Sequence, residues 1–264
     1  MFLMKKFFTI CLPILVIMTL FGCSNRTIKQ KPSEVSLTVS AAASLDGVLQ
    51  EIKTDFEKKN KHITLLFNLG GSGALKQQIL QGAPTDLFIS AAKEQFDELL
   101  EKKLIDKQDQ IDLLTNQLVL ITNKKNPSTL KGFADLKKDK IKKIAIGTPE
   151  SVPAGMYALQ SLQHLNLWDT IEKKVVQTKD VRQVLTYVET NNVDAGIVYM
   201  TDVKISDKVK VVQVADAKTH DPIIYPAGII TSTTHKKETT LFYEYLKSNT
   251  AKTIFEKYGF KVLD

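Results

Sequence analysis

Residues 36–59, SLTVSAAASLDGVLQEIKTDFEKK, give the clearest indication of the fold. Residues 36–40 alternate apolar and hydroxyl side chains and predict a β-strand, whereas residues 45–59 carry apolar side chains at helical spacing. The small residues Ala41–Ser44 join the two. A strand that passes into a helix through such a short turn is the first half of a βαβ unit, in which helices connect parallel strands.

The same alternation continues along the chain. We expect further strands at residues 63–69 and 86–90, with helices around residues 75–80 and 96–100. A second series comprises strands at 117–122, 144–147, 174–178, 195–199, 209–214 and 223–231 and helices at 153–165, 181–190 and 241–258. The last helix should end at Gly259, because glycine readily adopts the left-handed conformation that follows a helix. The pattern predicts an α/β protein.

Composition excludes several classes of protein. The chain has 264 residues, 43% hydrophobic and 25% charged, which is the balance of a globular protein rather than of a disordered or polytopic membrane protein. It has 36 basic and 29 acidic residues, interleaved along the whole length, so we expect a solvated surface and no nucleic-acid partner. Zinc-protease, EF-hand and P-loop motifs are absent from the sequence, so we expect no cofactor.

The N-terminus has the features of an export signal. Residues 1–22 begin with the basic pair Lys5 and Lys6 and continue with the apolar stretch Phe7–Phe21, which is shorter than the about 20 residues that a membrane span needs. We interpret residues 1–22 as a signal peptide. The motif Leu20-Phe21-Gly22-Cys23 resembles a lipobox, which implies cleavage before the cysteine and its acylation.

Cysteine usage agrees with this interpretation. Cys11 lies in the predicted signal peptide and Cys23 would carry the lipid, so the mature fold would hold no disulfide and no cysteine metal site. The polar residues 23–34 would form a lipidated tether. An uncleaved anchor with an incidental cysteine is the alternative.

Several strand-to-helix junctions carry small or hydroxyl residues. These are Ser44, the glycine-rich turn Gly70–Gly73, Pro153 at a predicted first helical position, and Asp180 as a predicted N-cap. A helix N-terminus offers free N–H groups and a partial positive charge. Ligands of open parallel sheets bind at the carboxyl ends of the strands, so converging helix starts there would form an anion site without formal charge.

Six motifs in order resemble the molybdate-binding proteins of ABC molybdate transporters, from about Leu37 to Phe260. They are Ala41-Ala42-Ala43-Ser44-Leu45, Gly82-Ala83-Pro84-Thr85-Asp86-Leu87-Phe88-Ile89-Ser90-Ala91, Val152-Pro153-Ala154-Gly155-Met156-Tyr157-Ala158, Asp180-Val181-Arg182, Gly196-Ile197-Val198-Tyr199 and Tyr258-Gly259-Phe260. The resemblance implies a type II periplasmic solute-binding fold with two lobes, each with a mixed, mostly parallel sheet flanked by helices. Lobe 1 would comprise residues 35–116 and 226–264, and lobe 2 residues 117–225.

The resemblance also implies the ligand contacts. Ser44, Ser72 and Tyr199 would donate hydroxyl groups to a tetrahedral oxyanion, and Ala154 and Val181 would donate backbone N–H groups. Molybdenum would be present only within molybdate, without direct bonds from protein atoms. Many family members have several hydroxyls in the glycine-rich turn, whereas this chain has only Ser72 there.

The function implied is that of a receptor and not of an enzyme. We expect a monomer, lipid-anchored on the extracytoplasmic face of the cell membrane, that binds molybdate or tungstate between two lobes and delivers it to the permease subunits of an ABC transporter. A receptor for another tetrahedral oxyanion, such as sulfate, is the main alternative.

A serine hydrolase is a distant alternative. Residues Gly70–Ala74 approach the G-x-S-x-G nucleophile elbow, with Ser72 as the nucleophile and His220 as a later base. The four histidines lie in polar surroundings typical of surface residues, which argues against this alternative.

Overall fold

The computed structural model describes residues 33–125 and 130–263, and their elements lie in a compact unit, Glu34–Asp264. The predicted signal peptide, Cys23 and all of the tether before Ser33 lie outside the described residues. Within the described ranges, no helix combines the length and apolar character needed to cross a membrane.

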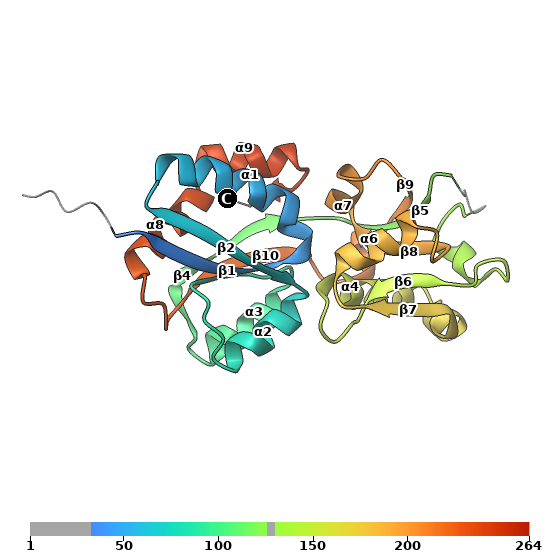
Figure 1. Cartoon of the computed structure of the whole chain (residues 1–264). Coiled ribbons are helices and arrows are strands. Elements are labelled where there is room, and N and C mark those ends of the chain that lie inside the picture. Colours follow the sequence, from blue (N-terminus) through green and yellow to red (C-terminus); the bar gives the residue numbers. More distant parts are fainter. Residues whose placement is uncertain (1–32, 126–129, 264) are drawn as a thin grey trace, which may run out of the picture. The chain divides into compact units, whose positions relative to one another are not determined.

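The first sheet has the strand order β11-β4-β10-β3-β1-β2. Its strands are β1 (Val35–Ala42), β2 (Ile63–Gly70), β3 (Leu87–Ile89), β4 (Ile105–Thr115), β10 (Ile224–Ile230) and β11 (Lys261–Val262). Its helices are α1 (Asp46–Lys59), α2 (Ser72–Leu80), α3 (Lys93–Glu101), α8 (Lys236–Leu246) and α9 (Asn249–Lys257). Helices α1 and α9 cover one face of this sheet, and α2 and α3 cover the other (Figure 1).

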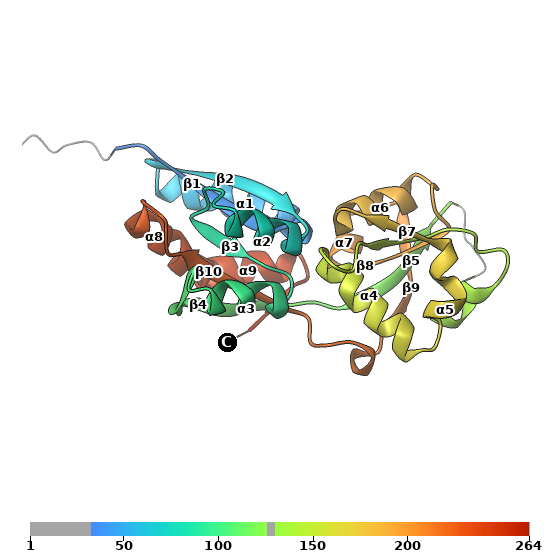
Figure 2. The same ribbon diagram turned by 90° about the horizontal axis from the view of Figure 1, so that it is seen from below.

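The second sheet has the order β7-β6-β8-β5-β9. Its strands are β5 (Leu118–Asn123), β6 (Ile144–Gly147), β7 (Val175–Thr178), β8 (Ala195–Tyr199) and β9 (Val209–Val214). Its helices are α4 (Pro153–His164), α5 (Trp168–Ile171), α6 (Val181–Glu189) and α7 (Met200–Lys204), with short 3-10 helices at Phe133–Lys137, Glu172–Lys174 and Ala217–Thr219. The sheet lies between α6 and α4 (Figure 2).

The sheets are mixed, as expected for the α/β class, but parallel pairing does not dominate them. Within the described residues, the first sheet has two parallel and three antiparallel pairings, and the second has two of each. The expectation of mostly parallel sheets was wrong on this point. The reason is that β10, which returns from the second sheet, enters the first one antiparallel to both β3 and β4.

Two segments connect the sheets. Asn116 and Gln117 lead from β4 to β5, and residues 215–223 lead from β9 back to β10. The segments are neighbours at the first sheet, because Tyr225 in β10 pairs with Leu114 in β4. The division into lobes at residues 116 and 226 stays a prediction.

The predicted helical spacing after the first strand is confirmed by burial. Leu45, Val48, Leu49, Ile52 and Phe56 are all buried, in α1 or in the 3-10 helix η2 (Ala43–Leu45) that precedes it. A fully buried aliphatic or phenylalanine side chain stabilises a fold by about 1.5–3 kcal/mol. This face of α1 therefore holds the helix on the first sheet and fixes the position of the turn before it.

Two elements differ from the sequence-based expectation. Strand β4 was not predicted, because its stretch IDKQDQIDLLT is mostly polar and largely solvent-accessible over its first half. The single helix predicted over residues 241–258 is two helices, α8 and α9, because Ser248 caps α9 by accepting a hydrogen bond from the Ala251 N–H at 3.3 Å. The predicted stop at Gly259 is confirmed by its φ of +91°.

Candidate functional site

The turns that begin the helices meet at one small cavity with an empty volume of about 200 Å³, part of it open to solvent. The lining residues come from the strand ends, turns and helix starts around both sheets and comprise Ala42, Ala43, Ser44, Gly70, Gly71, Ser72, Ala91, Val152, Pro153, Ala154 and Val181. Four of the five predicted ligand residues are among them. Tyr199, the fifth, is not among the lining residues.

Ser44 belongs to η2, which continues β1 and precedes α1. It is buried, and its hydroxyl lies 3.0 Å from the hydroxyl of Tyr225 in β10. It does not act as the N-cap of α1, a role that falls to Leu45. The Ser44 hydroxyl is thus hydrogen-bonded to Tyr225, which lies 181 positions away in the sequence, and does not cap its own helix.

Ser72 is the first residue of α2, and Gly71 occupies the N-cap position. Its fully buried hydroxyl oxygen accepts a hydrogen bond from the Ala91 N–H at 2.9 Å. This bond uses the oxygen as an acceptor, so the hydroxyl hydrogen remains for donation to a ligand. The partner that positions Ser72 is a backbone N–H and not the histidine that a hydrolase would require.

Ala154 supplies a backbone donor in the first turn of α4. Its predecessor Pro153 has no N–H, and the N–H groups of Gly155 and Met156 both donate to the Val152 carbonyl, at 2.9 and 3.0 Å. A first-turn N–H has no carbonyl within its own helix. The Ala154 N–H is therefore the donor of this turn that is left for an external acceptor.

Val181 occupies the equivalent position in α6. The predicted N-cap is confirmed, because the Asp180 carboxylate accepts a hydrogen bond from the Gln183 N–H at 2.9 Å. This cap leaves the N–H of Val181, the first helical residue, without an acceptor inside the helix. Val181 lines the cavity, and its side chain is buried.

Tyr199 ends β8 and is 1% exposed. Its hydroxyl lies near that of Tyr225 but makes no hydrogen bond of regular geometry within the described ranges, and the two ring centroids are 5.8 Å apart. Burial raises the pKa of Tyr199 well above its ordinary value, so the phenol is neutral and keeps its proton for donation. A buried donor without a hydrogen bond of regular geometry is rare, which is consistent with the predicted ligand contact of Tyr199.

Ionisable side chains are absent among the described residues that line the cavity. A charged pair next to two of the predicted ligand residues is formed by Arg182 and Asp202, whose Nε and Oδ1 atoms are 3.7 Å apart. Arg182 Nε also donates to the Ala43 carbonyl at 3.2 Å, and Asp202 accepts from the Tyr199 N–H at 3.1 Å. Burial raises the pKa of Asp202 to about 6, although the guanidinium opposes this shift. Sequence analysis missed this pair, because Arg182 and Asp202 lie on different helices, α6 and α7, and meet only through tertiary packing.

Two glycines allow the two sides of the cavity to approach each other. The Gly73 N–H donates to the Ser151 carbonyl at 2.9 Å. A Cβ atom on Gly73 would lie 2.8 Å from Ser151 Cα, and one on Gly71 would lie 2.8 Å from the Ser151 carbonyl oxygen. The glycine-rich turn is thus required for backbone-to-backbone contact, in addition to carrying Ser72.

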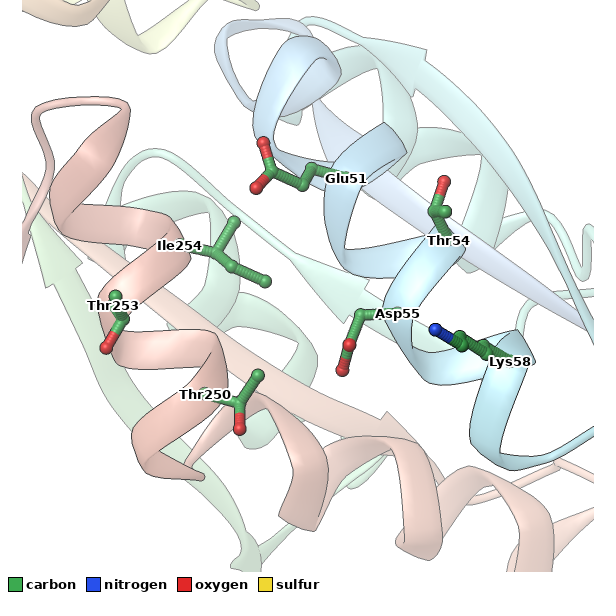
Figure 3. A pocket seen from close by; sticks show the side chains of 7 residues that line it. All are labelled: Glu51, Thr54, Asp55, Lys58, Thr250, Thr253 and Ile254. Atoms are coloured by element: carbon green, nitrogen blue, oxygen red, sulfur yellow. The ribbon is translucent and has the colours of Figure 1, made fainter.

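A larger groove lies between α1 and α9, with an empty volume of about 1040 Å³ (Figure 3). Its lining includes the carboxylates of Glu51 and Asp55, which form ion pairs with Lys257 and Lys59 at 2.8 and 2.7 Å. Acidic side chains already held by lysines disfavour a bound anion. The groove also lies on the helices, away from the carboxyl ends of the strands.

This fold and cavity are those of a solute-binding protein, and the chain belongs to the family of bacterial extracellular solute-binding proteins, whose model matches residues 37–261. It is therefore a binding protein and not a serine hydrolase. It is 48% identical over 257 residues to a Bacillus subtilis protein named as an ABC transporter substrate-binding lipoprotein, YvgL, covering 97% of this chain and 98% of the relative.

Two further comparisons bear on the ligand and the fold. The chain is 40% identical over 236 residues to the molybdate-binding protein ModA of Escherichia coli, covering 87% of this chain and 90% of that protein. The structure of the sulfate-binding protein SubI of Mycobacterium tuberculosis superimposes with a TM-score of 0.76 at 16% identity, covering 87% of this chain and 88% of SubI. The expected solute-binding fold is thus confirmed, while the fold alone does not select among oxyanions.

Proposed function

We propose that this protein binds molybdate, and also tungstate, in the cavity and delivers it to the permease subunits of an ABC transporter. The observation that carries the proposal is the convergence of Ser44, Ser72, Ala154 and Val181 on a cavity whose described lining has donors but no ionisable side chain. Helix N-termini and hydroxyls can hold an anion without formal positive charge. Tyr199 would contribute the fifth donor from the edge of the site.

The donor-only lining also supports a choice among oxyanions. Phosphate carries a proton near neutral pH, and that proton needs an acceptor such as a carboxylate. Molybdate, tungstate and sulfate are fully deprotonated dianions, so the lining suits them better. Sulfate is smaller than molybdate, and we propose that it is bound weakly because the donors cannot all reach its oxygens at once.

An oxyanion panel tests this function. Micromolar molybdate and tungstate should raise the melting temperature of the purified mature domain, because a ligand that binds only the folded state stabilises it by mass action. Phosphate should have no effect and sulfate only a weak one at the same concentrations. Equal stabilisation by sulfate and molybdate would show a general oxyanion receptor instead.

We also propose that Cys23 is acylated and anchors a monomeric receptor on the extracytoplasmic face of the cell membrane. The lipobox-like motif before Cys23 supports this, as does the word lipoprotein in the name of the Bacillus subtilis relative. Two acyl chains are enough for stable anchoring, whereas a single chain is marginal.

The native protein should incorporate labelled palmitate and partition into detergent, and Cys23→Ala should abolish labelling. A wild-type protein that takes up no label would contradict the anchor.

A further inference from the structure

We propose that Asn116 and Tyr225 form a hydrogen-bond relay that turns the Ser44 hydroxyl into a dedicated donor to the bound anion. Both are positioning residues that act through Ser44. The inference rests on the proposed function, because it specifies how one of the proposed donors is oriented.

The relay begins at Asn116, between β4 and β5. Its side-chain oxygen accepts a hydrogen bond from the Gln117 N–H at 2.9 Å. Its amide nitrogen donates to Thr201 Oγ1 at 2.8 Å and to the Tyr225 hydroxyl at 3.3 Å. Because a backbone N–H can only donate, the contact with Gln117 fixes which end of the amide is oxygen. The amide nitrogen therefore must face Tyr225 as a donor.

Tyr225 transmits this direction to Ser44. Burial raises the pKa of Tyr225 far above its ordinary value, so the phenol keeps its one hydrogen. Asn116 occupies the phenol oxygen as a donor, and the Ser44 oxygen, 3.0 Å away, is the acceptor that the described residues offer to the phenol hydrogen. In the opposite arrangement, with Ser44 donating, the phenol hydrogen of Tyr225 would be left with the neighbouring Tyr199 hydroxyl, which makes no hydrogen bond of regular geometry in the described part of the chain. A buried donor left in this way is costly.

The direction of the relay decides what Ser44 presents to the cavity. Once Ser44 accepts from Tyr225, its own hydrogen is left to point toward the cavity that it lines. A hydroxyl that already accepts a hydrogen bond is also polarised toward stronger donation. Thr201 belongs to α7 of the second sheet's layer and Tyr225 to β10 of the first sheet, and Asn116 lies in the segment that joins β4 to β5. The orientation of Ser44 therefore depends on how this connecting segment is placed.

The test is a double-mutant cycle on molybdate affinity, measured by calorimetric titration. Tyr225→Phe keeps the ring, which packs against Tyr199 and Phe260, and removes only the hydroxyl. We expect it to weaken binding about 2- to 10-fold, the range of a neutral hydrogen bond. The decisive measurement is Ser44→Ala with Tyr225→Phe, which should bind no more weakly than Ser44→Ala alone, because the relay acts through the serine hydroxyl.

Tyr245→Phe provides a matched control. It also removes a phenol hydroxyl that bonds to a side chain, here Asp55 at 2.8 Å, but outside the relay, and it should leave the affinity unchanged. Wild-type affinity in Tyr225→Phe, or additive losses in the double variant, would overturn the relay while the proposed function stands. Absence of molybdate binding by the wild type would instead refute the proposed function, and the relay with it.

Discussion

Val181→Pro should bind molybdate about 10- to 150-fold more weakly than Val181→Ala, because it removes one backbone donor to a charged ligand. A hydrogen bond to a charged group contributes about 1.5–3 kcal/mol, which corresponds to that loss. Proline is compatible with the first position of a helix, since the N–H there has no helical acceptor. Asp180 already has the extended conformation, with φ −160° and ψ 168°, that a following proline requires.

Comparing Val181→Pro with Val181→Ala separates the loss of the backbone N–H donor from the loss of side-chain packing. The Val181 side chain is 3% exposed, so both variants lose buried valine contacts, whereas only proline loses the N–H. Calorimetric titration with molybdate measures the affinities, and thermal melts without ligand should give similar midpoints for the two variants. Equal affinities would show that the Val181 N–H is not a ligand donor.

Gly73→Ala should weaken molybdate binding about 5- to 150-fold, because the added methyl group would force the two sides of the cavity apart. The added Cβ would lie 2.8 Å from Ser151 Cα and 2.9 Å from its carbonyl oxygen, and these backbone atoms cannot rotate away as a side chain could. Overpacking of this kind costs about 1–3 kcal/mol. Because alanine favours a helix over glycine, the loss should come from the contact with Ser151 and not from a weaker helix α2.

Gly70→Ala is the control in the same turn. Gly70 also lines the cavity, but its Cβ would meet only the Leu75 side chain, at an ordinary contact distance of 3.6 Å, and not Ser151. Binding should therefore change much less than in Gly73→Ala. The measurements are again titration with molybdate and melting without ligand. If Gly73→Ala bound as tightly as the wild type, the contact with Ser151 would not be part of the ligand-bound arrangement.

Much of the fold and part of the candidate site could be predicted from local signals. Pro153 and Asp180 mark the starts of α4 and α6, because helix capping depends on residues only a few positions apart. Strand β4 could not be predicted, because its apolar side chains are separated by charged ones and its place in the sheet comes from pairing with β10. The break at Ser248 was missed because a capping serine within an amphipathic stretch resembles a surface residue of one helix.

Local sequence patterns account for the alternating strands and helices, for the helix starts and hence for the kind of donors that the protein can offer to an anion. These features depend on backbone preferences and short-range periodicity. The tertiary structure decided which donors share a cavity and what orients them: Tyr225 against Ser44, Arg182 against Ala43 and Gly73 against Ser151. Such contacts join residues tens to hundreds of positions apart, and their distances are set by how helices and sheets pack, a property that no local stretch of sequence carries.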